Sequence, residues 1–155
     1  MSGRRHNTHF QRMLVAYDGS SQSEKAVELA FSLAECIDST VLVFAVARPP
    51  EPATSVELGA VLDDAREHYE EGFKKIREKA RAHNLEVKTD IAVGHPGEQI
   101  IHRAELEGID LIILWATGTI NDLKDDVGIS FRAGPALRAL SGNGRALNRL
   151  WIAEL

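Results

Sequence analysis

One stretch of this chain, residues 40–47, constrains the fold more than any other. It reads Thr-Val-Leu-Val-Phe-Ala-Val-Ala, an almost continuous run of apolar and β-branched residues. A strand that is apolar on both faces is typical of the centre of a parallel sheet, where helices cover both sides. The sequence therefore predicts an α/β fold built around this segment.

Strands and helices are predicted to alternate along the rest of the chain. Apolar runs predict further strands at residues 12–17, 85–93 and 109–114. Apolar residues at helical spacing predict helices over residues 21–36, 60–84 and 98–107. This alternation favours right-handed crossovers and a doubly wound, mostly parallel sheet with helices on both faces. Residues 150–153 are the candidate for a fifth strand.

Ligands of doubly wound sheets bind beyond the carboxyl ends of the strands. In this chain those ends are followed by Asp18-Gly19, a proline-rich loop at residues 48–55, a turn at residues 94–97, and Thr117-Gly118. We therefore expect a functional site along this edge.

Charge and composition exclude several classes of partner and site. The net charge of -5 argues against broad attraction to nucleic acid or anionic lipid. The longest apolar runs are far shorter than the roughly 20 residues of a membrane-spanning helix. Residues 1–11 form a polar tail without the apolar core of a secretory signal. We expect a cytoplasmic protein with a single domain over residues 12–155 and no nucleic-acid or membrane partner.

The chain offers neither a recognisable catalytic constellation nor a metal-ligand pattern. Cys36 is the single cysteine, which excludes an intramolecular disulfide and cysteine-rich zinc sites. Cys36 lies at the end of an apolar helix face, where a buried thiol is expected. Ser20 and Ser21 have no base at recognisable spacing, and His95 and His102 lack further ligands. We predict neither a catalytic residue nor a metal site.

Two segments together resemble the universal stress protein family. They are Met-Leu-Val-Ala-Tyr-Asp-Gly-Ser at residues 13–20, and Val-Gly-His-Pro-Gly-Glu-Gln-Ile-Ile at residues 93–101 with Asp-Leu-Ile-Ile at 110–113. The resemblance covers roughly residues 12–114. It implies a five-stranded fold like that of the adenine nucleotide alpha hydrolases, a role in the stress response, and in many members ATP binding. It also implies a homodimer paired through the last strand.

The resemblance also implies a nucleotide site. The family's aspartate at the end of the first strand lies beside the adenosine and matches Asp18, with Tyr17 and Gly19 as its neighbours. A valine late in the second strand, whose backbone hydrogen-bonds adenine, matches Val46. On structural grounds alone, Asp18 is equally suited to a helix cap or turn, and Val46 to a buried strand.

The family's phosphate loop, Gly-x2-Gly-x9-Gly-Ser/Thr, is matched incompletely. Gly118 and Gly128 align with its second and third glycines, and Ser130 follows the hydroxyl position by one residue. Trp115 replaces the first glycine, and Ile129 replaces the hydroxyl residue. After this loop the family usually continues with a helix and a closing strand, but Gly134-Pro135 interrupts the helix expected here. Residues 115–155 are therefore atypical. Either the reading frame shifts near Trp115, or the chain has diverged and its phosphate site is weakened or lost.

Three functions follow as hypotheses. The first is a stress-response module that binds ATP or a related adenine nucleotide with little or no turnover, with the presence of Mg²⁺ left open. The second is an interaction protein of the same family that uses no nucleotide, which Trp115 and Ile129 favour. The third is an enzyme that uses bound ATP, and the missing base and basic phosphate clamp count against it.

Overall fold

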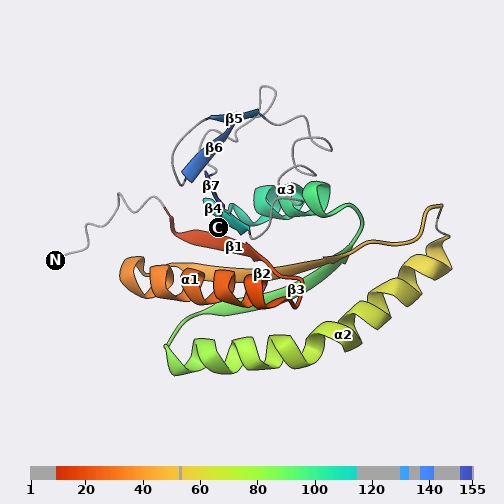
Figure 1. The fold of residues 1–155 in the computed structure, drawn as a ribbon, viewed down its shortest axis with the longest axis horizontal. Helices are drawn as coiled ribbons and strands as arrows, with labels where there is room; N and C mark the ends of the chain where they lie inside the picture. The colour runs from red at the N-terminus through yellow and green to blue at the C-terminus, as the bar shows by residue number, and fades with distance from the viewer. Residues whose placement is uncertain (1–9, 53, 115–129, 133–136, 142–150, 155) are drawn as a thin grey trace.

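The sheet has the predicted doubly wound, mostly parallel architecture (Figure 1). The computed structural model describes residues 10–52, 54–114, 130–132, 137–141 and 151–154. Its elements in chain order are β1 (Arg12–Ala16), α1 (Ser21–Ile37), β2 (Thr40–Ala47), α2 (Ser55–Ala82), β3 (Val87–Val93), α3 (Pro96–Glu107), β4 (Leu111–Leu114), β5 (Ser130–Arg132), β6 (Leu137–Ser141) and β7 (Trp151–Glu154). The strand order is β3-β2-β1-β4-β7-β6-β5.

Five strands are parallel, as expected, but the sheet has seven strands rather than five. β1 to β4 and β7 form the parallel part, and β7 is the predicted fifth strand. β5 and β6 extend the sheet as antiparallel strands, where the family resemblance implies a helix. Gly134-Pro135 in the sequence between them is unfavourable in a helix interior, which explains the difference.

The last strand is not an edge of the sheet. β7 pairs with β4 on one side and with β6 on the other, so both of its edges are hydrogen-bonded within the chain. Pairing of two copies through the last strand, which the resemblance implied, therefore has no free edge at β7. The strands that end the sheet are β3 and β5.

Helices cover both faces of the sheet and enclose two apolar cores. On one face, Phe31 of α1 and Phe73 of α2 are buried against β1, β2 and β4. On the other face, Ile100 of α3 packs with Phe44 of β2. The apolar side chains of β2 are divided between these cores, which confirms the prediction of a strand covered on both sides.

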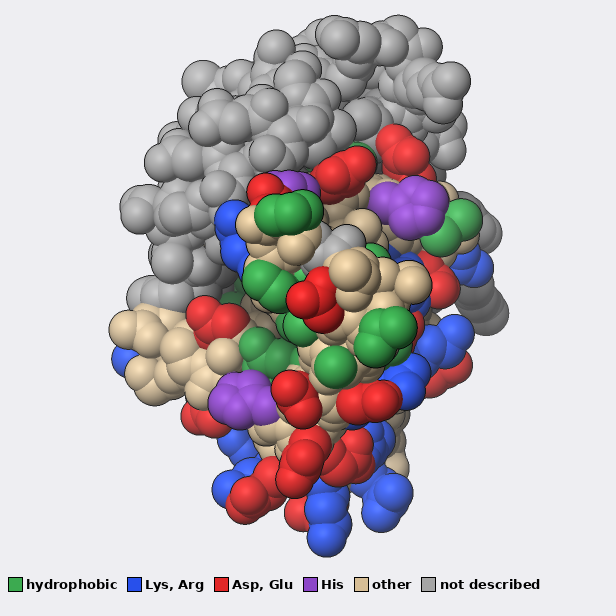
Figure 2. Space-filling model, turned by 90° about the vertical axis from the view of Figure 1, so that its right-hand side faces the viewer, with side chains coloured by type: hydrophobic (Ala, Val, Ile, Leu, Met, Phe, Trp, Pro, Cys, Tyr) green, Lys and Arg blue, Asp and Glu red, His purple; other side chains and the backbone are tan. Residues whose placement is uncertain are grey.

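The helix α2 begins five residues earlier than the apolar pattern predicted. Thr54 Oγ1 accepts a hydrogen bond from Glu57 N at 3.2 Å, and Glu57 Oε2 accepts one from Thr54 N at 2.6 Å. This reciprocal capping box starts the helix at Ser55, within the segment predicted as a loop. Figure 2 shows acidic and basic side chains mixed on the lower part of the face, over α2. The predicted pair of Glu71 and Lys75 is present, with a nitrogen-to-oxygen distance of 3.3 Å.

Gly59, in the exposed first part of α2, gives a prediction on stability. A methyl group added there has no heavy atom within 4 Å. Glycine costs a helix interior about 0.5–1 kcal/mol relative to alanine. Gly59→Ala is therefore expected to raise the free energy of unfolding by about 0.5–1 kcal/mol, measured by urea denaturation. An unchanged or lower value would contradict the exposed helical position of this residue.

Cys36 is exposed, which corrects the prediction of a buried thiol. The residue precedes the last position of α1, and the apolar stripe that packs on the sheet ends at Ala34. In the described part of the chain, no helix is both long enough and apolar enough to cross a membrane.

Candidate functional site

The candidate site lies where the winding of the sheet reverses. β1 lies between β2 and β4, and the chain leaves β1 toward β2 through α1 but reaches β4 from the opposite face through α3. Such a switch point leaves the carboxyl ends of the two central strands open to a ligand. The segment after β1, which begins Tyr17-Asp18-Gly19, lies at this point.

The turn after β1 is held by short hydrogen bonds and a glycine. Ser20 N donates to Asp18 Oδ1 at 2.9 Å. Ser20 is the N-cap of α1, because its Oγ accepts a hydrogen bond from Ser23 N at 3.1 Å. Gly19 has φ of +83°, a conformation that residues with a Cβ rarely adopt. Asp18 is thus a turn residue rather than the helix cap, and it remains exposed beside the first turn of α1.

The carboxylate of Asp18 is held in its ionised form. Partial burial would raise its pKa, but hydrogen bonds from Ser20 and Ser23 outweigh this effect, so the pKa lies below its ordinary value. At neutral pH the site therefore presents a carboxylate that accepts hydrogen bonds, for example from hydroxyl groups of a ligand.

The lowered pKa of Asp18 predicts how its contribution to stability depends on pH. A carboxyl whose folded pKa lies below its unfolded value of about 3.9 stabilises the protein fully above that value. The contribution is lost as pH falls through the folded pKa. The difference in unfolding free energy between the wild type and Asp18→Asn is expected to stay constant from about pH 7 to 5 and to shrink below about pH 4, measured by urea denaturation. A difference that grows as the pH falls would contradict the lowered pKa.

Tyr17 anchors the turn in an aromatic cluster under the site. Its ring is buried, with its centroid 6.0 Å from that of Tyr69 and 5.7 Å from that of Phe73. Tyr69 in turn lies against Gly19, since a Cβ at that glycine would be 3.8 Å from the Tyr69 ring. Burial raises the pKa of Tyr17, helped by the negative charge of Glu24, and burial also raises the pKa of Tyr69. Both phenols are therefore neutral at pH 7.

Gly72 makes room for the Tyr17 hydroxyl. A Cβ at Gly72 would be 2.4 Å from Tyr17 Oη and 3.3 Å from Cζ. Neither Tyr69 nor Gly72 was predicted from the sequence to be part of the site. Both residues lie on the face of α2 that packs toward the sheet: Tyr69 precedes Phe73 by four residues, and Gly72 precedes it by one. This position in the helix is the sequence signal that could have identified them.

The backbone of Val46 is directed toward the space beyond the end of β1. Backbone groups of a strand alternate between its two neighbours. Phe44 O accepts a hydrogen bond from Tyr17 N at 2.9 Å, on the β1 side, whereas Ala47 O accepts one from Gly94 N, on the β3 side. The N–H and C=O of Val46 therefore face the β1 side, past the last paired residue of β1. The half-buried side chain of Val46 packs with the core under α3.

The turn between β3 and α3 borders the same edge. Pro96 opens α3, two residues before the predicted start of this helix, and Gly94 has φ of +151°. His95 Nε2 lies 3.0 Å from Glu51 Oε1, which joins this turn to the proline-rich loop. Gly97 is buried in the first turn of α3.

The structure does not bring all predicted site residues together. Tyr17, Asp18, Gly19 and Val46 share the carboxyl edge of β1 and β2. Ser130 begins β5, four strand positions from β1, or about 19 Å at the usual strand spacing. Gly118 and Gly128 lie outside the described residues, as do Trp115 and Ile129.

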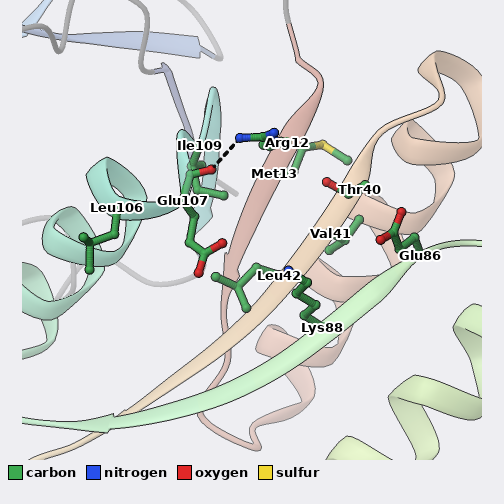
Figure 3. A pocket seen from close by; sticks show the side chains of 10 residues that line it. All are labelled: Arg12, Met13, Thr40, Val41, Leu42, Glu86, Lys88, Leu106, Glu107 and Ile109. Atoms are coloured by element: carbon green, nitrogen blue, oxygen red, sulfur yellow. Dashed lines mark hydrogen bonds between the residues drawn. The ribbon is translucent and has the colours of Figure 1, made fainter.

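A pocket of about 400 Å³ lies at the opposite end of the strands (Figure 3). Arg12 and Thr40, the first residues of β1 and β2, line it, and Arg12 Nη1 donates to Glu107 O at 3.0 Å. This pocket is therefore separate from the switch point. Within the described ranges, no group of three or more histidine, cysteine, aspartate or glutamate residues is arranged to hold a metal ion.

Comparison with known proteins points to one family. The model of the universal stress protein family matches residues 9–125. The chain is 33% identical over 126 residues to universal stress protein YxiE of Bacillus subtilis (strain 168), covering 75% of this chain and 84% of that protein.

Solved structures of the family share the fold. A universal stress protein family structure from Burkholderia pseudomallei superimposes with a TM-score of 0.64 at 17% identity, over 76% of this chain and 90% of that one. The universal stress protein from Archaeoglobus fulgidus in complex with dAMP gives a TM-score of 0.50 at 17% identity, over 74% of this chain and 89% of that one.

Proposed function

Because this chain belongs to the universal stress protein family, we propose that it binds an adenine nucleotide and acts as a stress-response module with little or no turnover. The observation that carries the proposal is the direction of the Val46 backbone. Its N–H and C=O point past the end of β1, beside the turn that holds Asp18. A donor and an acceptor from one extended residue suit the edge of an adenine ring.

The other groups of this edge suit the ribose. Asp18 is ionised and exposed, so its carboxylate is able to accept hydrogen bonds from ribose hydroxyls. Gly19 itself contributes no side chain to the turn, and Tyr17 fixes the turn to α2 through its ring contacts with Tyr69 and Phe73. The complex of the Archaeoglobus fulgidus relative with dAMP supports an adenine nucleotide as the ligand class.

We further propose ATP, with Mg²⁺ as a candidate companion, as the ligand, with Gly118, Gly128 and Ser130 on the phosphate side. The support is the partial match to the family's phosphate pattern, in which glycines let the backbone approach the phosphates. We also propose a cytoplasmic location and a homodimer, in keeping with what the family resemblance implies.

A second candidate function is an interaction protein that uses no nucleotide. Three observations favour it: Trp115 stands at the first glycine of the phosphate pattern, Ile129 supplies no hydroxyl, and Ser130 lies in β5. In that case the carboxyl edge would keep its turn and its strand geometry without a phosphate site.

Thermal unfolding with nucleotides distinguishes the two functions. A ligand at 100 times its Kd stabilises the folded state by about 2.7 kcal/mol, which raises the Tm by several degrees in a domain of this size. We expect AMP and ATP at millimolar concentration, with and without Mg²⁺, to raise the Tm, and GMP and GTP to leave it unchanged. No shift with any adenine nucleotide would favour the interaction protein.

A further inference from the structure

The edge strand β3 carries a row of backbone groups that no other described strand pairs. Glu86 O accepts a hydrogen bond from Val41 N, and Gly94 N donates to Ala47 O, so even-numbered residues of this segment face β2. By alternation, the N–H and C=O groups of Val87, Thr89 and Ile91 face away from the sheet. Such a row is a template for another strand. β3 has seven residues, against three in β5 at the other end of the sheet.

We propose that the chain dimerises through β3, with two copies antiparallel about a two-fold axis at Thr89. The inference deepens the homodimer proposed above and rests on it. In this register Thr89 faces its own copy, Lys88 faces Asp90 of the second copy, and Val87 faces Ile91. The outward backbone groups of Val87, Thr89 and Ile91 then pair, which makes one continuous sheet from two.

The charges of β3 are complementary in this register. Lys88 and Asp90 lie on the same face as Leu42 and Phe44, their partners on β2. Figure 3 shows Lys88 together with Leu42 around the pocket. Lys88 is exposed, and among the residues that the structure describes it has no carboxylate within 4 Å. Lys88 and Asp90 would be opposed as non-hydrogen-bonded pairs, in which side chains come closest, so each interface would gain two such contacts.

In the single chain, the carboxylate of Asp90 hydrogen-bonds one of the outward-facing N–H groups of β3. Ile91 N, one of the outward groups, donates to Asp90 Oδ1 at 2.8 Å. The other oxygen of Asp90 is paired with Arg103 of α3, whose guanidinium carbon lies 4.9 Å from the centre of the Phe44 ring. On pairing, the Ile91 N–H passes to Val87 O of the second copy, and Asp90 Oδ1 is released to Lys88. In the single chain this carboxylate therefore accepts the hydrogen bond of Ile91 N. In the dimer it favours the register in which it faces Lys88 of the second copy.

The first test is the oligomeric state of charge variants, measured by sedimentation velocity over a range of concentrations. Lys88→Asp places two carboxylates opposite each other at two points of the interface. The dimer Kd is therefore expected to rise about tenfold or more. The matched control is Lys25→Asp in the first part of α1, an exposed lysine on a different element, which should leave the Kd unchanged.

The second test fixes the register by cross-linking in a Cys36→Ser background. Cα atoms of directly opposed residues lie about 5.5 Å apart, within reach of a disulfide. Thr89→Cys should therefore form a covalent dimer on oxidation. Val87→Cys should not, because the two copies of residue 87 lie four residues apart along the strand, or about 13 Å.

The possible results distinguish a dimer with a different interface from a protein that does not dimerise. A dimer that tolerates Lys88→Asp and is not cross-linked at residue 89 would overturn the β3 interface but keep the homodimer. A wild-type protein that is monomeric at all concentrations would overturn both.

Discussion

In the Gly72→Ala variant, the free energy of unfolding is expected to fall by about 1–3 kcal/mol. The sign is opposite to the usual one, because alanine normally stabilises a helix interior by about 0.5–1 kcal/mol relative to glycine. The added methyl would lie 2.4 Å from Tyr17 Oη, and the Tyr17 ring is confined between Tyr69 and Phe73. The ring or α2 must therefore shift.

A double-mutant cycle with Tyr17→Phe isolates this contact. Removing the hydroxyl leaves ring carbons at 3.3 Å and beyond, so most of the overlap disappears. In the Tyr17→Phe background, Gly72→Ala should cost at least about 1 kcal/mol less than in the wild type, measured by urea denaturation. Gly59→Ala is the matched control in the same helix, because it makes the same change in open space. Equal stabilisation at Gly59 and Gly72 would show that the Tyr17 hydroxyl does not occupy this position.

Replacing Asp18 by alanine is expected to weaken AMP binding by about tenfold to a hundredfold. A hydrogen bond to a charged group contributes about 1.5–3 kcal/mol, which converts to that range of Kd. Asp18→Asn keeps an oxygen for Ser20 N but loses the charge, so it should bind with intermediate affinity. The measurement is calorimetric titration with AMP.

Asp110 provides the matched control for this variant. Its Oδ2 also accepts backbone hydrogen bonds, from Gln11 N at 2.9 Å and Arg12 N at 3.1 Å, but at the opposite end of the sheet. Asp110→Asn should lower stability without changing the AMP Kd. If the Asp18 and Asp110 variants lose affinity equally, the loss reflects general destabilisation rather than a contact with the ligand.

The parallel part of the fold could be predicted because its signals are local. The apolar run of β2 and the helical spacing in α1 place these elements within about one residue of their observed bounds. β7 was also predicted, from the short apolar segment at residues 150–153. Strands that are buried on both faces of a parallel sheet need such apolar runs, so these strands can be recognised in the sequence alone.

Most of the features that were missed depend on contacts between residues far apart in the sequence, and the exception is the local start of α2. The early start of α2 rests on a pair of side-chain hydrogen bonds at Thr54, which the apolar pattern does not report. The role of Gly72 appears only when α2 lies against Tyr17. Likewise, Val46 and its neighbour Ala47 are both apolar strand residues in the sequence, and only the pairing of β2 with β1 and β3 shows which one faces the site. The antiparallel strands β5 and β6 stand where a helix was expected: Gly134-Pro135 disfavours the helix, but only the tertiary structure shows which strands pair.

The central claim, that the edge at Asp18 and Val46 binds an adenine nucleotide, is tested most directly by calorimetric titration of the wild-type protein. AMP, ATP and GMP are titrated in turn, with and without Mg²⁺, and the Asp18→Ala variant is titrated in parallel. We predict saturable binding of AMP and ATP that is lost or weakened at least about tenfold in Asp18→Ala, with no binding of GMP. Absence of heat with both adenine nucleotides up to millimolar concentration, or equal binding by the variant, would contradict the claim.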